Sequence, residues 1–167
     1  MNVQEQLKAY ALFQGLSDSD LNFVASLIKE KRVKTGSIII QEGEVGGELF
    51  LLEDGIVDVS KTLTIVTSKH DFGTKERSFT RLTGEDHCFF GEMSVFRSSA
   101  RSATVKAVTE CTLFVINDKD FLELCERYPR IGYIVITNIA LLLSEHLRKT
   151  SEDVIKLTTA LSLALSG

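Results

Sequence analysis

The chain has 167 residues, with 19 Lys and Arg against 23 Asp and Glu, which gives a formal net charge of -4. A mildly acidic chain lacks the positive surface that non-specific binding to nucleic acid or to an anionic membrane requires, so we expect neither as a partner. A chain of this length typically forms one domain and buries enough surface to fold without cross-links.

Cysteine usage and the apolar runs indicate a cytoplasmic protein. Cys88, Cys111 and Cys125 form no CxxC pair, which argues against a disulfide framework and a zinc knuckle. No basic segment followed by an apolar run begins the chain, so no secretory signal is predicted. The longest apolar stretch, 131–143, is shorter than the roughly 20 residues that span a bilayer. We expect a soluble protein.

The first 30 residues are predicted to be helical. Apolar residues at helical spacing indicate two short helices that pack on the rest of the domain. Ser17 and Asp20 form a capping-box pattern, which places the start of the second helix.

Residues 31–117 have the pattern of antiparallel β-structure. Short β-branched runs alternate with glycines, which favours a sandwich, barrel or jelly roll over parallel βαβ units. The predicted strands are 37–40, 49–52, 56–59, 63–66, 103–108 and 112–116. The polar stretch 67–78 is predicted to be an exposed hairpin loop. The fold class is therefore mainly β with flanking helices (α+β), built on an antiparallel, jelly-roll-like β-roll.

Residues 118–167 are predicted to form two helices separated near Pro129. Along the second, apolar residues follow steps of four and three, a stripe that we call the seam: Ile136, Ala140, Leu143, Leu147, Thr150, Val154, Leu157, Leu161 and Ala164. Such a stripe must be buried, and a second copy of the chain is the simplest partner, so we expect a homodimer through this helix. Alternatively, residues 150–153 start a new helix that folds back on the roll.

The residues that carry chemistry gather in 89–105. Gly91 opens a predicted helical turn whose unpaired N–H groups attract an anion such as phosphate. Glu92 would repel an anion and is suited to accept hydrogen bonds from a ligand hydroxyl, whereas Arg101 offers the anion a planar charged fork. Together they select a ligand that holds a phosphate close to a sugar hydroxyl, as a nucleotide does.

The run 89–95 (FFGEMSV), with Arg101 nine residues after Glu92, resembles the phosphate-binding cassette of the cyclic-nucleotide-binding domain family. The resemblance covers most of the chain, because 12–16 (LFQGL) resembles the family's opening motif and 42–55 contains glycines where its β-roll has them. It implies helices over 1–30, a roll over 31–117 with the cassette at 89–105, and a lid and dimer helix within 118–167. It also implies a cyclic mononucleotide ligand, cAMP or cGMP, bound without catalysis and without a cofactor or metal.

The resemblance further implies the role of each site residue. Glu92 would bind the ribose 2′-hydroxyl and Arg101 the cyclic phosphate, with backbone amides around Gly91 and Ala103 completing the anion site. The implied ligand-binding residues are Phe90, Gly91, Glu92, Met93, Ser94, Arg101, Ser102 and Ala103. The sequence departs from the family pattern at Ala100, where many members have proline, at Ser94, where a small apolar residue is common, and in the longer approach 84–90.

Two other functions are compatible with parts of the same pattern. A domain that has lost its ligand would use Arg101 for a surface ion pair and Glu92 to cap a turn, and would serve as a protein-interaction scaffold. A cupin-like enzyme would need clustered metal ligands, whereas the three histidines are scattered. We therefore predict a non-catalytic sensor whose terminal helix, through Tyr133 or a neighbour, closes over the base and signals to a second copy or to an unidentified protein partner.

Overall fold

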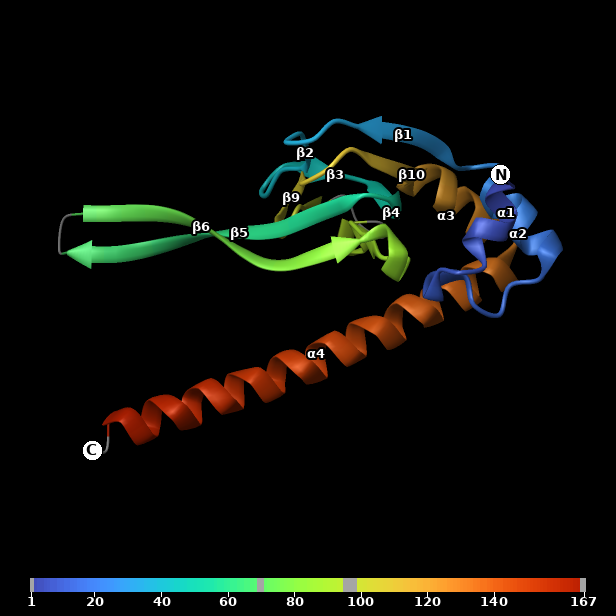
Figure 1. The fold of residues 1–167 in the computed structure, drawn as a ribbon. Helices are drawn as coiled ribbons and strands as arrows, with labels where there is room; N and C mark the ends of the chain where they lie inside the picture. Colours follow the sequence, from blue (N-terminus) through green and yellow to red (C-terminus); the bar gives the residue numbers. More distant parts are fainter. Residues whose placement is uncertain (1, 69–70, 95–98, 166–167) are drawn as a thin grey trace.

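The computed structural model describes residues 2–68, 71–94 and 99–165, with side chains for 2–61, 80–93 and 99–165. Its centre is a β-roll with helices gathered at one end (Figure 1). From that end the last helix, α4 (Pro129–Leu165), runs beside the roll and beyond it.

Short helical elements form the N-terminal part, as the apolar spacing predicts. They are α1 (Val3–Leu7), the 3-10 turn η1 (Ala11–Phe13) and α2 (Asp18–Ala25). The predicted capping box is confirmed, because the Asp20 N–H donates to the Ser17 hydroxyl and the Ser17 N–H donates to the Asp20 carboxylate. Hydrogen bonds from Ser17, and then from Arg130 of α4, lower the pKa of the Asp20 carboxyl. The start of α2 is thereby tied to α4.

In the described residues the strands form two four-stranded antiparallel sheets and one short pair, so the predicted β-roll is confirmed. The first sheet has the order β1 (Lys29–Val33), β10 (Cys111–Asn117), β4 (Glu48–Asp54), β7 (Phe89–Phe90). The second has the order β2 (Ile38–Ile40), β9 (Thr104–Ala107), β5 (Ile56–Ser68), β6 (Asp71–Thr83). The pair joins β3 (Val45–Gly46) to β8 (Ser99–Ala100).

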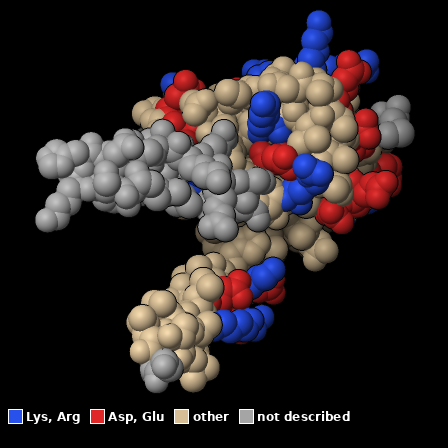
Figure 2. Space-filling view, turned by 60° about the vertical axis from the view of Figure 1, so that its left-hand side comes forward, with Lys and Arg blue, Asp and Glu red and all other residues tan. Residues whose placement is uncertain are grey.

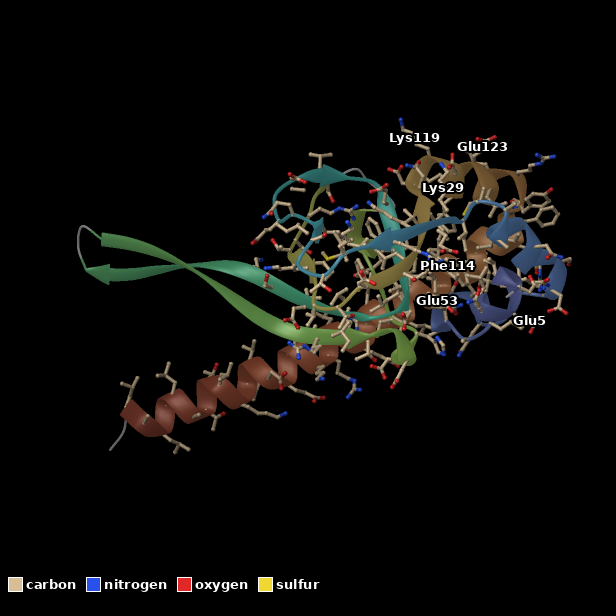
Figure 3. All side chains as sticks on the ribbon, turned by 45° about the horizontal axis from the view of Figure 1, so that its top comes forward. Glu5, Lys29, Glu53, Phe114, Lys119 and Glu123 are labelled. Carbon is tan, nitrogen blue, oxygen red and sulfur yellow. The ribbon has the colours of Figure 1, made fainter. Side chains whose placement is uncertain are left out.

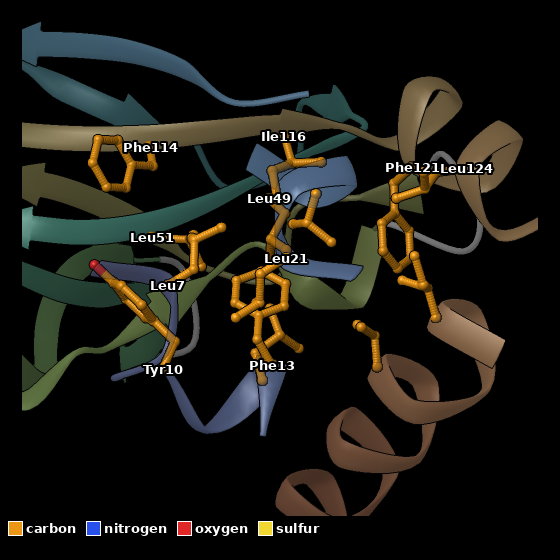
Figure 4. Packing of buried hydrophobic residues seen from close by; sticks show 14 of the residues in the cluster. Leu7, Tyr10, Phe13, Leu21, Leu49, Leu51, Phe114, Ile116, Phe121 and Leu124 are labelled. Carbon is orange, nitrogen blue, oxygen red and sulfur yellow. The ribbon is translucent and has the colours of Figure 1, made fainter. Parts of the chain in front are cut away.

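Two apolar clusters hold these layers together. One lies inside the roll and joins side chains of both sheets, including Phe50, Leu113, Val57 and Val105. The other lies between the roll and the helices, and Figure 4 shows its members converging from the N-terminal segment, β4, β10 and α3 (Asp118–Arg127). Burial of these side chains supplies most of the free energy of folding and fixes the helices against one end of the roll.

The prediction of a loop over 67–78 is wrong for 67–68 and 71–78, which are strand, while 69–70 lie outside the described residues. β5 continues to Ser68, β6 begins at Asp71, and the two strands pair along their length. β9 pairs with β5 only from Val57 to Ser60, so the rest of the hairpin is a two-stranded ribbon that extends beyond the roll (Figure 1). A ladder satisfies backbone N–H and C=O groups whatever the side chains are, so polar composition alone does not identify a loop.

The C-terminal part consists of α3 and α4, separated near Pro129 as predicted. The two helices pack closely at Gly132, where a Cβ would lie 2.8 Å from the Cβ of Cys125. Helix α4 continues through Thr150 without a break, so the alternative in which the last residues fold back on the roll is wrong. Among the described residues, no helix is long and apolar enough to cross a membrane.

The capping box gives a test of the N-terminal packing. Replacing Ser17 with Ala removes the acceptor for the Asp20 N–H and should lower the free energy of unfolding by about 1 kcal/mol. Urea unfolding measures this change. Ser144→Ala, at an exposed position inside α4, is the control and should not lower stability; equal losses in both variants would contradict the role of the cap.

Candidate functional site

A cavity of about 330 Å³ lies between the second sheet, residues 89–93 and 100–103, and α4. Apolar side chains of the strands form part of its wall: Ile40, Val59, Leu82 and Val105. Seven of the eight predicted site residues line it: Phe90, Gly91, Glu92, Met93, Arg101, Ser102 and Ala103. The eighth, Ser94, ends the 3-10 turn η3 (Glu92–Ser94), and its side chain is outside the described set.

Gly91 makes the close approach on which the site is built. Its φ of +88° lies in the left-handed region that favours glycine, and a Cβ there would lie 2.6 Å from the carbonyl oxygen of Glu48. The turn η3 follows directly, as the sequence predicts, so backbone N–H groups of its first residues lie beside the cavity.

Arg101 is buried at the cavity wall, with 8% of its surface exposed. Its Nη1 donates to the carbonyl oxygens of Glu48 at 3.0 Å and Gly91 at 3.3 Å, and its guanidinium carbon lies 5.9 Å from the ring centre of Phe50. The Arg101 side chain is therefore part of the cavity wall and not of the open surface. Burial lowers the pKa of the guanidinium, but an arginine remains protonated at neutral pH.

The backbone around Arg101 is anchored on the segment before β4. The Arg101 N–H donates to the Glu44 carbonyl at 2.8 Å, and the Gly43 N–H donates to the Arg101 carbonyl at 2.9 Å. Pairing of β3 with β8 continues this contact. The arginine is thus fixed by main-chain bonds on one side and by side-chain bonds on the other, which leaves little freedom to its guanidinium.

The cavity combines one cation, one anion and apolar walls. Glu92 is half-buried at the start of η3, while Ser102 and Met93 lie at the exposed rim, with the Ser102 Oγ 3.4 Å from the Met93 Sδ. Such a set accepts a ligand that carries an anionic group, a hydroxyl and an apolar ring. Among the residues with described positions, no cluster of three or more His, Cys, Asp or Glu side chains could hold a metal ion.

Helix α4 contributes His146, which is not among the predicted site residues. His146 lines this cavity and an adjoining one of about 250 Å³ that also contains Glu92. Tyr133, the residue singled out as a possible lid, is 73% exposed and lies on another side of the helix. The signal for His146 was the spacing of four, four, three and four from Ile131, through Val135, Ile139 and Leu142, which continues the side of α4 that faces the roll.

The amino-acid sequence of the chain matches the model of a known protein family. Residues 30–128 match the family model described as the cyclic nucleotide-binding domain, which is more than half of the chain. The chain belongs to this family.

Known members resemble this cyclic nucleotide-binding domain over most of its length. The cyclic AMP receptor protein of Thermus thermophilus is 30% identical over 144 residues, which are 86% of this chain and 60% of that protein. The crystal structure of Thermus thermophilus catabolite activator protein matches with a TM-score of 0.73 and 28% identity, covering 89% of this chain and 63% of that one. The regulatory domain of Toxoplasma gondii PKA, solved with cAMP, matches with a TM-score of 0.60 and 27% identity, covering 72% and 42%.

These relatives support a regulatory role through cyclic nucleotide binding. The chain spans 60% of the length of the first curated relative.

Gly91 gives a test of the site's geometry. In Gly91→Ala the side chain would occupy a left-handed backbone position and also collide with the Glu48 carbonyl and with Nη1 of Arg101, 2.9 Å away. The backbone conformation should cost about 1–2 kcal/mol, and the collision about 1–3 kcal/mol more. Urea unfolding measures the sum.

Gly43→Ala is the matched control, since Gly43 has a φ of +84° but no atom within 4 Å of its Cβ position. It isolates the backbone cost from the collision. Equal destabilisation in the two variants would show that the contact with Glu48 and Arg101 is not tight.

Proposed function

We propose that this cyclic nucleotide-binding domain is a non-catalytic sensor that binds cAMP or cGMP in the cavity beside η3 and signals through α4. The observation that carries the proposal is that Glu92 and Arg101, one suited to a hydroxyl and one to an anion, line the same cavity. The names of the relatives support the ligand class, because one is called a cyclic AMP receptor and another was solved with cAMP.

In this proposal each side chain meets one part of the nucleotide. Arg101 binds the cyclic phosphate, and the backbone amides near Gly91 and Ala103, with the hydroxyl of Ser102, complete the anion site. Glu92 accepts a hydrogen bond from the ribose 2′-hydroxyl.

The remaining predicted residues would surround the base and sugar. Phe90 and Met93 supply apolar contact, and Ser94 belongs to the same turn. His146 approaches from α4 and can both donate and accept hydrogen bonds, so it is the proposed contact for the base. This contact would link occupancy of the cavity to the position of α4.

Nucleotide binding should raise the melting temperature. Ligand at a hundred times its dissociation constant stabilises the folded state by about 2.7 kcal/mol, which is a shift of several degrees for a chain of this size. A thermal melt with millimolar cAMP and, separately, cGMP measures the shift.

Arg101→Ala should weaken nucleotide binding at least about thirtyfold by calorimetry, because the phosphate loses its charged partner.

Arg32→Ala is the control for loss of charge, since the Arg32 side chain is 84% exposed on β1. It should leave affinity unchanged. No melting shift with either nucleotide would favour the ligand-free scaffold, and full affinity in Arg101→Ala would show that another group binds the phosphate.

The seam on α4 supports a homodimer as the output of the sensor. Leu147 and Val154 of the seam are 68% and 55% exposed. At about 100° per residue, the seam and the charged residues from 145 to 156 occupy opposite sides of the helix. Figure 2 shows this separation, because uncharged surface covers the end of α4 and the charged side chains gather along one side. A second copy is the proposed partner that covers the seam.

Charge on the seam should prevent this dimer. The double variant Leu147→Glu with Val154→Glu would bring like charges together across the two-fold axis, so sedimentation should give the monomer mass. The control pair, Leu141→Glu with Leu163→Glu, changes two equally exposed leucines on the opposite side of α4 and should keep the dimer. An unchanged mass in the seam variant would refute the seam as the interface.

A further inference from the structure

Two buried charged side chains approach one short segment of backbone, 46–48, which links β3 to β4. They are Arg101, on the wall of the cavity, and Asp118, the first residue of α3, and each is 8% exposed. Both residues have contacts with this segment, and only Arg101 lines the cavity of the proposed nucleotide site.

Arg101 contacts the segment at its two ends. Nη1 donates to the carbonyl of Glu48, and a Cβ at Gly46 would lie 2.6 Å from Nε and 2.7 Å from Nη2 of Arg101. Any side chain at position 46 would therefore displace the guanidinium.

Asp118 contacts the segment at its middle. Its N–H donates to the carbonyl of Gly47 at 2.6 Å, and a Cβ at Gly47 would lie 2.7 Å from Oδ1 of Asp118 and closer still to Oδ2. The φ of Gly47 is not in the left-handed region, so glycine is required here for space and not for backbone freedom. Lys119, the next residue, is exposed and points away from the roll (Figure 3).

The charges close to Arg101 indicate why the position of Asp118 matters. A buried guanidinium needs negative charge close by, because it has lost most of its hydration. Burial lowers the pKa of Arg101, and the carboxylates of Glu48, Asp118 and Glu92 raise it. Of the three carboxylates, Glu48 raises the pKa of Arg101 most. Glu48 and Glu92 are half-buried, however, whereas Asp118 is buried, so solvent screens the charge of Asp118 least.

We propose that Asp118 is the positioning residue for Arg101: its carboxylate and N–H hold residues 46–48 and the guanidinium where a cyclic phosphate can be bound. The inference deepens the proposed function, on which its ligand-binding part rests. Asp118 does not line the cavity, so it acts on the phosphate through Arg101. Because it also begins α3, which packs on α4 at Gly132, the position of Arg101 is tied to the C-terminal helices.

A plainer role for Asp118 is that of an acid in the first turn of a helix, where negative charge is favourable. Asp120 has that role too, in the same turn, and it pairs with Lys29 of β1 at 4.0 Å on the surface. A comparison of variants at Asp118 and Asp120 therefore separates the effect of negative charge at the helix start from the effect on Arg101.

The experiment compares Asp118→Asn with Asp120→Asn. Asparagine keeps the size of the side chain and an oxygen acceptor for the Lys119 N–H, but removes the charge. We expect Asp118→Asn to weaken cAMP or cGMP binding about three- to tenfold by calorimetry and Asp120→Asn to change it by less than about twofold. Unchanged or tighter binding in Asp118→Asn would overturn the proposal, the latter because Asp118 would then compete with the phosphate.

Moving the carboxylate gives a rescue test. A side chain at position 47 would enter the space of the Asp118 carboxylate. The double variant Gly47→Asp with Asp118→Ser therefore places a carboxylate in the same space, carried by residue 47 in place of residue 118. Its affinity should return to within about threefold of the original, whereas Gly47→Asn with Asp118→Ser should stay weak. Equal affinities in these two variants would overturn a role for the charge.

A measurement without nucleotide separates this inference from the proposed function. The Nε–H signal of Arg101 in the NMR spectrum of the ligand-free protein reports directly on the guanidinium. It should shift, and exchange faster with solvent, in Asp118→Asn but not in Asp120→Asn. If the original protein binds neither nucleotide, the proposed function fails, while this signal still supports or overturns the positioning role.

Discussion

The structure depends on burying one guanidinium at the wall of a small roll. A buried cation must be hydrogen-bonded, and the carbonyls that accept from Arg101 belong to Glu48 and Gly91, which are far apart in sequence. Pairing of Phe50 with Phe90 between β4 and β7 brings these two carbonyls together. The left-handed backbone of Gly91 then turns the chain toward the arginine. The register of β4 against β7 and the glycine at position 91 are therefore both needed for Arg101 to be buried with its hydrogen bonds made.

Much of the fold could be predicted from the sequence because its signals are local. Ser17 and Asp20 mark a helix start within four residues, and the glycine-punctuated β-branched runs mark the roll. β1 was not predicted, because Lys29–Val33 is a largely exposed edge strand without apolar alternation. The part of the hairpin beyond Val66 was missed for a related reason: its pairing is set by the partner strand, and its composition is that of a loop.

The candidate site could be predicted as a set of residue types but not as an arrangement. The spacing of Glu92 and Arg101 was informative because both belong to one cassette, and seven predicted residues line the same cavity. His146 and Asp118 come from other elements, and their proximity to the site arises from packing of α4 and α3 on the roll. In the sequence Gly47 is indistinguishable from a turn glycine. The structure shows that the Asp118 carboxylate occupies the space that a side chain at position 47 would need.

Helix α4 is much longer than the surface on which it rests. Its buried contacts with the rest of the chain end near Ile139, yet it continues to Leu165. At 1.5 Å per residue, the part of α4 after Gly132 is about 50 Å long. A tilt of about 5° where α3 meets α4 would carry its tip roughly 4 Å sideways. Rearrangements at the roll too small to alter its packing would therefore be magnified at the far end, where another molecule could sense them.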